Sequence, residues 1–378
     1  MKILLIANTS SELLSRKKLL RALLEIGYKL YIVSNMAEKD IKIINELNIT
    51  SISIPIFPRS KNILKNLSLY VAYKKIFRSV RPDIILSFHI KPNIYGGLLA
   101  KKLNIPFIVN ITGLGSVFEK ASFTQKLVVW LYKKAFNSKK CFVFFQNKDD
   151  KALFIDKEII IYPEQVDVLP GSGVDLDFFS SKGVEKKEKN IMEFSYIGRL
   201  VIAKGVKLFI DAAQKISESR KDCIFNIAGS YIEGDKEFLQ KEDLELACKN
   251  PQIKYHGKID DVRSFLMDHT DCLVFPSYYR EGVPRCLLEG AAIVCPLIAS
   301  NSVGTKEPCK DGINGYLFEE RNLEDLVQTI LKFLDLGIEK RREMGLASRR
   351  IAEKYFSDEI VLDKYLKKIK DIVNAGNS

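Results

Sequence analysis

The fold class follows from one stretch, Cys272-Leu273-Val274-Phe275-Pro276-Ser277-Tyr278-Tyr279-Arg280-Glu281-Gly282-Val283-Pro284-Arg285-Cys286-Leu287-Leu288-Glu289. Its first four residues form an apolar run that ends at a proline, which predicts a short buried strand. The leucines and alanines after Pro284 predict a helix, and proline suits the first helical position because its missing N–H is not needed there. A strand, a loop and a helix in this order are typical of a parallel α/β sheet. Glu281 is therefore expected in a strand-to-helix loop.

Two carboxylates, Glu281 and Glu289, are expected to line one pocket beside this loop. Glu289 falls about one and a half turns into the helix, and the free N–H groups of the first turn favour an anion near the loop. Carboxylates accept hydrogen bonds from hydroxyls, and a nucleotide sugar combines hydroxyls with phosphate. The alternative is a surface loop with solvated acids, which the spacing of the two glutamates alone would favour. The flanking residues favour the pocket.

Short apolar runs alternate with helical stretches along the whole chain. The strands are expected at 3–7, 30–34, 51–56, 84–88, 107–110, 141–146 and 166–170, and again at 193–197, 224–228, 253–255, 272–275 and 297–299. This alternation predicts two parallel, doubly wound sheets. A charged linker at 180–190 separates an N-terminal domain, 1–180, from a second domain, 181–355, and the helix in 356–378 is expected to return to the first. Ligands bind at the carboxyl ends of such strands, so the domains are expected to face a central cleft.

The composition is that of an ordinary globular protein, with 47% apolar and 28% charged residues among 378. Seven cysteines, without a C-x-x-C pair, argue against a disulfide framework or a zinc site and favour a reducing cytosol. The apolar start, 1–7, has no cleavage-site pattern and fits a buried strand better than a signal peptide. The sequence has no uninterrupted apolar stretch of the roughly 18 residues that a membrane span needs.

The excess of basic over acidic residues is confined to the first half of the chain. Residues 1–180 hold 27 Lys and Arg against 15 Asp and Glu, whereas 181–378 hold 32 of each. Such a field suits an anionic membrane surface, an anionic substrate or nucleic acid. Two stretches, 59–75 and 123–140, predict basic amphipathic helices that could lie on a membrane. The alternative is that each packs its apolar stripe on the sheet.

A second motif, Tyr196-Ile197-Gly198-Arg199-Leu200 followed by Lys204-Gly205, ends the first strand of the second domain. Gly198 permits a tight turn, and Arg199 and Lys204 could both reach a diphosphate at the helix start. Together with the two glutamates, this motif resembles the donor site of the retaining family-4 glycosyltransferases, which have the GT-B fold of two Rossmann-like domains. The resemblance includes Val303-Gly304-x-x-Glu307 and Asp311-Gly312-x-Asn314-Gly315-Tyr316-Leu317 and covers nearly the whole chain.

The resemblance implies a role for each charged residue of the site. Arg199 and Lys204 would clamp the pyrophosphate and offset the charge that builds on the leaving diphosphate. Glu281 would hold hydroxyls of the donor sugar, and Glu289 would hold the ribose hydroxyls. Gly198 would lie against the nucleotide at the turn.

Further residues complete the implied site. The backbone amides of Gly282 and Val283 would help to hold phosphate or sugar, and the nucleobase would rest near Lys258 and Ile259. His89 follows a strand of the first domain, and in this family a histidine so placed lies beside the donor sugar and the reaction centre. A lone histidine is more often structural, but the strand-end position favours the site.

Other segments modify the resemblance. The loop 110–118 resembles a Gly-Leu-Gly loop of bacterial members that extend polyprenyl-diphosphate-linked glycans, and a tight turn is the alternative. Residues 8–11 replace the glycine-rich loop of many relatives. Val294 stands where relatives usually have a glycine, which makes that turn less permissive.

No metal is expected at the site. Asp175 and Asp177 could hold Mg²⁺ against a diphosphate, but the resemblance implies that basic residues and helix N-termini take this role. His256 and His269 have no partners at metal-ligand spacing, so structural roles are expected for both.

The resemblance therefore implies a retaining, metal-independent hexosyltransferase without a further cofactor. It would move a sugar from a UDP-sugar to a polyprenyl-diphosphate-linked glycan during the assembly of surface polysaccharide, O-antigen or glycoprotein glycans. The expected sugar is an N-acetylhexosamine, GalNAc or GlcNAc, and the expected place is the cytoplasm, peripherally on the inner face of the membrane. Two alternatives stay open: a nucleotide-sugar epimerase on the same fold, and a basic nucleic-acid-binding protein, for which no binding module is recognisable.

Overall fold

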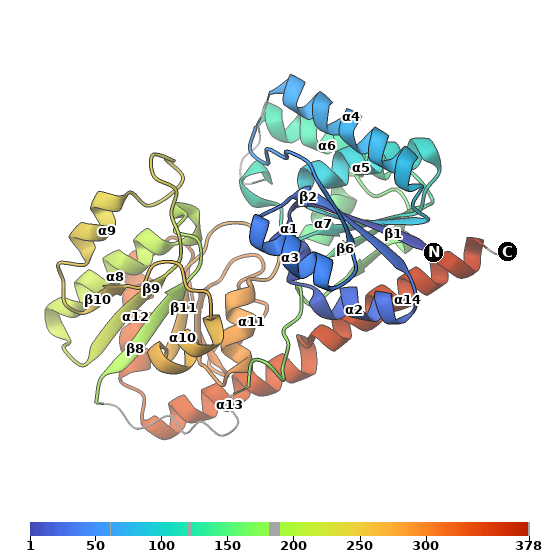
Figure 1. Ribbon diagram of the computed structural model, residues 1–378. Coiled ribbons are helices and arrows are strands. Elements are labelled where there is room, and N and C mark those ends of the chain that lie inside the picture. The colour runs from blue at the N-terminus through green and yellow to red at the C-terminus, as the bar shows by residue number, and fades with distance from the viewer. Residues whose placement is uncertain (61, 119–121, 181–189, 377–378) are drawn as a thin grey trace. The chain divides into compact units, whose positions relative to one another are not determined.

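The computed structural model describes residues 1–60, 62–118, 122–180 and 190–376 (Figure 1). The chain forms two compact units. The first contains Met1–Ser172 and Val361–Ser378, and the second contains Gly173–Ile360. Each unit is described by itself.

The first unit is built on a parallel sheet in the order β3-β2-β1-β4-β5-β6-β7. Its strands are β1 (Lys2–Thr9), β2 (Lys29–Asn35), β3 (Thr50–Ser53), β4 (Ile84–Phe88), β5 (Phe107–Ile111), β6 (Cys141–Phe145) and β7 (Val166–Val168). The predicted strand at 51–56 ends early, because Pro55 has no N–H to donate to a neighbouring strand. This strand order reverses direction between β1 and β4, as in doubly wound folds.

Side chains of each strand alternate between two helical layers. Leu4 and Ile6 of β1 belong to one core cluster, whereas Ile3 and Leu5 belong to the other, as the period of two in a strand requires. The first layer contains α4 (Ile63–Val80), α5 (Ile90–Leu103), α6 (Phe123–Phe136) and α7 (Lys148–Asp156). The second contains α1 (Ser10–Leu14), α2 (Lys17–Glu25), α3 (Glu38–Glu46) and α14 (Asp358–Gly376). Both faces of the sheet are therefore buried.

The second unit repeats this plan with the sheet order β10-β9-β8-β11-β12-β13. Its strands are β8 (Met192–Ile197), β9 (Cys223–Ala228), β10 (Ile253–Tyr255), β11 (Cys272–Phe275), β12 (Leu297–Ser300) and β13 (Gly315–Phe318). All pairings are parallel. The sequence did not predict β13, because this short strand begins at the last glycine of the Asp-Gly-x-Asn-Gly motif, which reads as a turn.

Helices cover the sheet of the second unit and share one apolar core with it. They are α8 (Val206–Ser219), α9 (Lys241–Ala247), α10 (Val262–His269), α11 (Arg285–Ala292), α12 (Leu323–Leu334) and α13 (Ile338–Tyr355). Short 3₁₀ turns occur at η1 (Gly115–Phe118), η2 (Pro163–Gln165) and η3 (Ile202–Lys204). The two parallel, doubly wound sheets predicted from the sequence are both confirmed.

The boundary between the units lies before Gly173, whereas the sequence predicted it at 181. Residues 173–180 belong to the second unit because Val174 pairs with Ser357 and because Arg349 donates to the carbonyls of Leu176 and Phe179. The linker predicted at 180–190 falls almost entirely on 181–189, which lie outside the described residues.

The last helix, α14, lies on the sheet of the first unit, beside α2 (Figure 1). Tyr365 and Ile369 are almost fully buried and share a core cluster with Leu86. Lys364 also donates to Asp167 and to the carbonyl of Val168 at 2.8 Å each. The first unit is therefore completed by residues from the far end of the chain.

Candidate functional site

The candidate site of the second unit lies at the carboxyl edge of its sheet. The strands β8, β9, β10 and β11 run parallel, so the loops that follow them emerge at the same edge. The strand order changes direction between β8 and β11. Arg199 and Lys204 follow β8, whereas Glu281 follows β11, so the sheet brings both predicted motifs to one place.

Three glycines hold these loops close together. A Cβ atom on Gly229 would lie 1.7 Å from the carbonyl oxygen of Gly198, and one on Gly205 would lie 2.0 Å from that of Pro276. A Cβ atom on Gly304 would lie 2.1 Å from the carbonyl oxygen of Gly282. Any larger side chain would push the loops apart, so these glycines set the spacing of the charged residues.

A buried hydroxyl cluster supports the loop that carries Glu281. Ser300 and Ser302 both donate to the carbonyl of Ser277, the latter at 2.9 Å. Thr305 donates to the carbonyl of Ser300 at 2.7 Å. The hydroxyl of Ser277 accepts a bond from the backbone of Tyr279 at 3.2 Å. Fully bonded buried polar groups of this kind fix a single loop conformation.

Lys204 and Glu281 form an ion pair, with 2.6 Å between Nζ and Oε1. Their side chains are only 15% and 13% exposed, so water screens the pair little. The ammonium also lies 5.7 Å from the ring centroid of Phe275 and 5.8 Å from that of Tyr279. An ammonium has three donors, so Lys204 can hold Glu281 and an anion together.

Arg199, which lies with Lys204 in the segment after β8, presents an exposed cation. Its backbone is fixed, because the buried hydroxyl of Tyr196 donates to its carbonyl at 2.9 Å. Among the described residues, its guanidinium has no ion-pair or hydrogen-bond partner. The fork of five N–H donors is therefore available for a diphosphate.

Glu289 is a nearly buried acid on α11. Burial raises its pKa, and the neighbouring Arg285, 3.2 Å away, opposes this shift. Burial also raises the pKa of the Cys286 thiol. This cysteine therefore stays protonated at neutral pH. Glu289 is poised to accept hydrogen bonds from a ligand that covers it.

The N-termini of α8 and α11 also face this edge. The sequence predicted Pro284 as the first helical residue of α11. In the structure Pro284 is the N-cap, so the helix begins one residue later, at Arg285. Neither α8 nor α11 has a side-chain cap among the described residues. The first N–H groups of an α-helix have no intrahelical acceptor, and they favour an anion.

The loop after β10 brings Lys258 and Ile259 to the same edge. The carbonyl of Gly257 accepts from the backbone of Gly229 at 2.8 Å, and the hydroxyl of Tyr255 donates to the carbonyl of Gly229 at 2.9 Å. Lys258 is exposed, whereas Ile259 packs partly on the core. The structure thus joins these two residues to the loop that contacts Gly198.

In the first unit, His89 lies at the carboxyl end of β4, as predicted, and caps α5. Its φ of 74° is in the left-handed region that favours glycine, a strain of about 1–3 kcal/mol that is found mainly at functional sites. The backbone N–H of Asn8 donates to its Nδ1 at 3.4 Å. Its Nε2 lies 3.7 Å from the carboxylate of Glu12.

Two family models match the chain and together leave out only residues 1, 148–176 and 352–378. The model described as "Glycosyl transferases group 1" matches residues 177–351, and "Glycosyl transferase 4-like" matches residues 2–147. The chain belongs to these glycosyltransferases. The resemblance to glycosyltransferases inferred from the motifs is confirmed at the level of the family.

Two relatives of this glycosyltransferase match most of its length. It is 24% identical over 332 residues to "UDP-Gal:alpha-D-GlcNAc-diphosphoundecaprenol alpha-1,3-galactosyltransferase" of Escherichia coli, with 84% of this chain and 82% of the relative covered. It is 26% identical over 325 residues to "N,N'-diacetylbacillosaminyl-diphospho-undecaprenol alpha-1,3-N-acetylgalactosaminyltransferase" of Campylobacter jejuni, with 81% and 80% covered.

Solved structures confirm the GT-B fold. A glycosyltransferase from Rickettsia africae superposes with a TM-score of 0.77 at 20% identity, covering 98% of both chains. Anabaena Alr3699/HepE, in complex with UDP and glucose, superposes with a TM-score of 0.78 at 15% identity, covering 98% of this chain and 100% of that one.

The remaining candidates of the glycosyltransferase have local partners. The carboxylate of Asp175 accepts from the backbone of Asp177 at 3.1 Å, which closes a turn. His256 lies 2.8 Å from the side chain of Asn226, and its ring centroid is 4.9 Å from that of His269. The described residues contain no group of three side chains suited to a metal ion.

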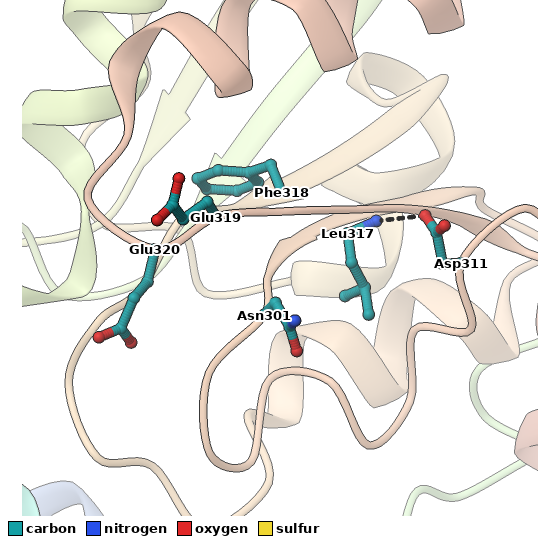
Figure 2. Close-up of a pocket in the computed structure, with 6 residues that line it drawn as sticks. All are labelled: Asn301, Asp311, Leu317, Phe318, Glu319 and Glu320. Carbon is teal, nitrogen blue, oxygen red and sulfur yellow. Dashed lines mark hydrogen bonds between the residues drawn. The ribbon is translucent and has the colours of Figure 1, made fainter.

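A cavity of about 350 Å³ lies beside the edge strand β13, and none of the residues predicted to bind the donor lines it. Figure 2 shows its lining, in which Asp311 accepts a bond from the backbone of Leu317. The lining residues are Asn301, Asp311, Leu317, Phe318, Glu319 and Glu320. Three of them are carboxylates, which repel a diphosphate, so this cavity is a poor candidate for the nucleotide.

The sequence analysis missed three residues around His89: Glu12, Arg16 and Tyr365. A Glu and an Arg four residues apart after the first strand could have indicated the pair Glu12–Arg16, which is 2.7 Å apart. No sequence signal connects Tyr365 with them, because it lies in the last helix.

Proposed function

We propose that this glycosyltransferase moves a sugar from a UDP-sugar to a glycan carried on a polyprenyl diphosphate, with retention of configuration and without a metal. The observation that carries the proposal is the group of Arg199, Lys204, Glu281 and Glu289 at one sheet edge. Both relatives described above are named for diphosphoundecaprenol-linked acceptors, one is named for UDP-Gal, and HepE was crystallised with UDP. These names support the donor and acceptor classes.

The basic residues take the diphosphate in this proposal. Arg199 offers an unpaired fork of donors, and Lys204 offers the ammonium protons that Glu281 leaves free. The N-terminus of α8, directly after Lys204, adds N–H groups with partial positive charge. All three are aimed at the charge that grows on the leaving UDP, so they lower the barrier to bond breaking.

The two acids bind hydroxyls in this proposal and do not transfer protons. Glu281 pairs with Lys204, 2.6 Å away, and accepts from hydroxyls of the donor sugar. Glu289, on the first turns of α11, accepts from the ribose. Gly282 and Val283 lie between them, and their backbone N–H groups meet phosphate or sugar. Lys258 and Ile259 flank the base.

The sugar leaves and is attacked on the same face. The departing phosphate oxygen takes the proton of the acceptor hydroxyl, so no enzyme nucleophile is required. The family resemblance gives His89 a role toward the donor sugar. Both relatives are named as α-1,3-transferases, and a donor with an α anomeric bond gives an α product only by retention. We expect an N-acetylhexosamine, GalNAc or GlcNAc, as the sugar.

A transfer assay tests this function. The purified protein is incubated with UDP-GalNAc, UDP-GlcNAc, UDP-Gal or UDP-Glc and a synthetic polyprenyl-diphosphate-linked monosaccharide, with and without EDTA. The proposal predicts one mass increment of an N-acetylhexosamine, an α-linked product by NMR and equal rates in EDTA. Interconversion of UDP-sugars without an acceptor would instead identify an epimerase, and salt-sensitive DNA binding without any UDP-sugar binding would identify a nucleic-acid-binding protein.

We also propose that the first unit binds the anionic inner face of the cytoplasmic membrane. Large apolar side chains in the amino-terminal halves of α4 and α6 are exposed, including Ile63 at 80%, Phe123 at 83% and Trp130 at 54%. We call this set the apolar rim, and it comprises Ile63, Leu64, Leu67, Val71, Phe123, Leu127 and Trp130. No helix among the described residues is long and apolar enough to cross a membrane.

The position and charge of the apolar rim support membrane binding. Both helices pack on α5, and α4, α5 and α6 follow β3, β4 and β5, so their first turns lie at the carboxyl edge that holds His89. Exposed lysines accompany the rim, among them Lys65 and Lys126. Apolar side chains beside lysines suit an interface of acyl chains and anionic headgroups, where a lipid-linked acceptor is found.

Vesicle sedimentation tests the apolar rim. Loss of two half-buried apolar contacts at about 1 kcal/mol each predicts about 30-fold weaker binding of Leu67→Ser/Trp130→Ser to vesicles with anionic lipid. The control Leu346→Ser changes an exposed leucine of α13 in the second unit. Equal loss in both proteins, or no binding of the wild type, would contradict the proposal.

A further inference from the structure

We infer that Glu12 is a positioning residue for His89, and that Arg16 and Tyr365 hold Glu12 in place, so that the last helix of the chain supports the reaction centre. The inference rests on the proposed function for the role of His89. It rests on contacts inside the first unit for the positioning itself.

Both ring nitrogens of His89 face a partner. The backbone N–H of Asn8 donates to Nδ1 at 3.4 Å, so Nδ1 has to be the acceptor. The proton of the neutral ring therefore lies on Nε2, which points to the Glu12 carboxylate 3.7 Å away. A carboxylate opposite a ring N–H fixes both the tautomer and the orientation of an imidazole.

Glu12 is itself held by a buried cation. Nη1 of Arg16 donates to the Glu12 carboxylate at 2.7 Å and to the Glu12 carbonyl at 2.6 Å. The guanidinium lies 4.4 Å above the ring of Phe88, the residue directly before His89. The same arginine thus contacts the residue before His89 and the carboxylate opposite it.

Tyr365 connects Arg16 to the sheet. The guanidinium of Arg16 interacts electrostatically with the hydroxyl of Tyr365, and this hydroxyl donates to the side chain of Asn110 at the end of β5. Asn110 in turn donates to the carbonyl of Ser87 at 3.1 Å. Burial raises the pKa of Tyr365 to about 12, so the hydroxyl keeps the proton that it donates to Asn110 at neutral pH.

The chain of contacts closes around His89. It starts at β1 with Asn8, passes through Glu12, Arg16 and Tyr365, and returns to β4 through Asn110. A ring held at both nitrogens has one orientation, and a misplacement of about 1 Å in a group at a reaction centre can cost about 100-fold in rate. The amino-terminal strand and the last helix therefore act on one side chain.

Histidine NMR tests the positioning directly, because the chain has only three histidines. Protein labelled with ¹⁵N-histidine is compared as wild type, Glu12→Gln, Glu12→Asp and Tyr365→Phe, and His89→Gln assigns the signals. Tyr355→Phe, an exposed tyrosine of α13, is the matched control. We expect a protonated Nε2 in the wild type, and shifted His89 nitrogen signals in Glu12→Gln and Tyr365→Phe with unchanged His256 and His269 signals.

Kinetics supply the second readout. We expect Glu12→Gln to lower kcat about 10- to 100-fold, whereas its KM for the UDP-sugar should stay within about 2-fold of the wild-type value. Glu12→Asp should recover part of the rate, and circular dichroism of the whole protein confirms that each variant is folded. Unchanged His89 signals in Glu12→Gln would overturn the inference, as would equal shifts of all three histidines. Absence of transfer by the wild type would overturn the proposed function alone, because the NMR result does not depend on activity.

Discussion

Replacing Lys204 with methionine should damage both the stability and the activity of the protein. Its Nζ lies 2.6 Å from the Glu281 carboxylate, and at an effective dielectric constant of about 20 this separation gives roughly 6 kcal/mol of gross attraction. Desolvation offsets much of that gain. Removal of one partner from a buried pair costs about 3–5 kcal/mol, and the residual exposure of 13–15% puts Lys204→Met near the lower end.

The same substitution removes a cation from the leaving group, which predicts a kcat about 100- to 1000-fold lower. A second change separates the two effects. In Lys204→Met/Glu281→Gln no charge is left unpaired, so most of the lost unfolding free energy should return, whereas activity should stay low.

Urea unfolding followed by circular dichroism and the transfer assay measure these effects. The control is Lys207→Met, whose side chain is 50% exposed and pairs with Asp211 on the surface of α8; its stability should change by less than about 1 kcal/mol. The reasoning is refuted if Lys204→Met matches this control in stability and keeps transfer within about 3-fold of the wild type.

Three further substitutions test other parts of the account. Glu289→Gln should weaken UDP binding about 10- to 100-fold by calorimetry, because hydrogen bonds to a charged group are worth about 1.5–3 kcal/mol. Burial raises the pKa of Glu289 in the folded protein above its ordinary value of 4.5. The wild type therefore loses unfolding free energy as the pH rises from about 4.5 through the folded pKa of Glu289. Urea unfolding at pH 4.5 and 7.5 should show this loss in the wild type and not in Glu289→Gln. Val294→Asn should raise the unfolding free energy by about 1 kcal/mol without changing transfer, because valine at a φ of 65° is strained whereas asparagine tolerates it; lower stability would contradict this. Gly304→Ala should lower kcat at least about 10-fold, because its Cβ would meet Gly282 at 2.1 Å, whereas Gly312→Ala, also at positive φ but with open space around it, should keep kcat.

Much of the fold is predictable because apolar runs and turn residues carry it. The strand at 84–88 is found with the predicted bounds, and the glutamates of the opening motif lie in the loop and the helix where the sequence predicted them. The less permissive turn at Val294 is also confirmed, since its φ is 65°. The strand β13 was missed because it has only four residues, too few to show a clear periodicity, and begins at the last glycine of a turn motif.

The contacts of the site were less predictable. The sequence assigned Lys204 and Glu281 to loops after strands, and adjacent strands bring the loops together, but their ion pair spans 77 positions. Tyr365 of α14 interacts with Arg16, which lies between α1 and α2, and with Asn110 of β5. Only tertiary packing places these groups together, so no local pattern records them.

The central claim is that the carboxyl edge of the second sheet binds a nucleoside diphosphate through Arg199 and Lys204. Calorimetric titration of the wild type and Arg199→Met with UDP and with uridine tests it most directly. Because charge-assisted bonds are worth about 1.5–3 kcal/mol each, the account predicts that UDP binds the wild type at least about 100-fold more tightly than uridine, and that Arg199→Met loses at least about 10-fold of this preference. Equal affinity of the wild type for UDP and uridine, or an unchanged preference in Arg199→Met, would contradict it.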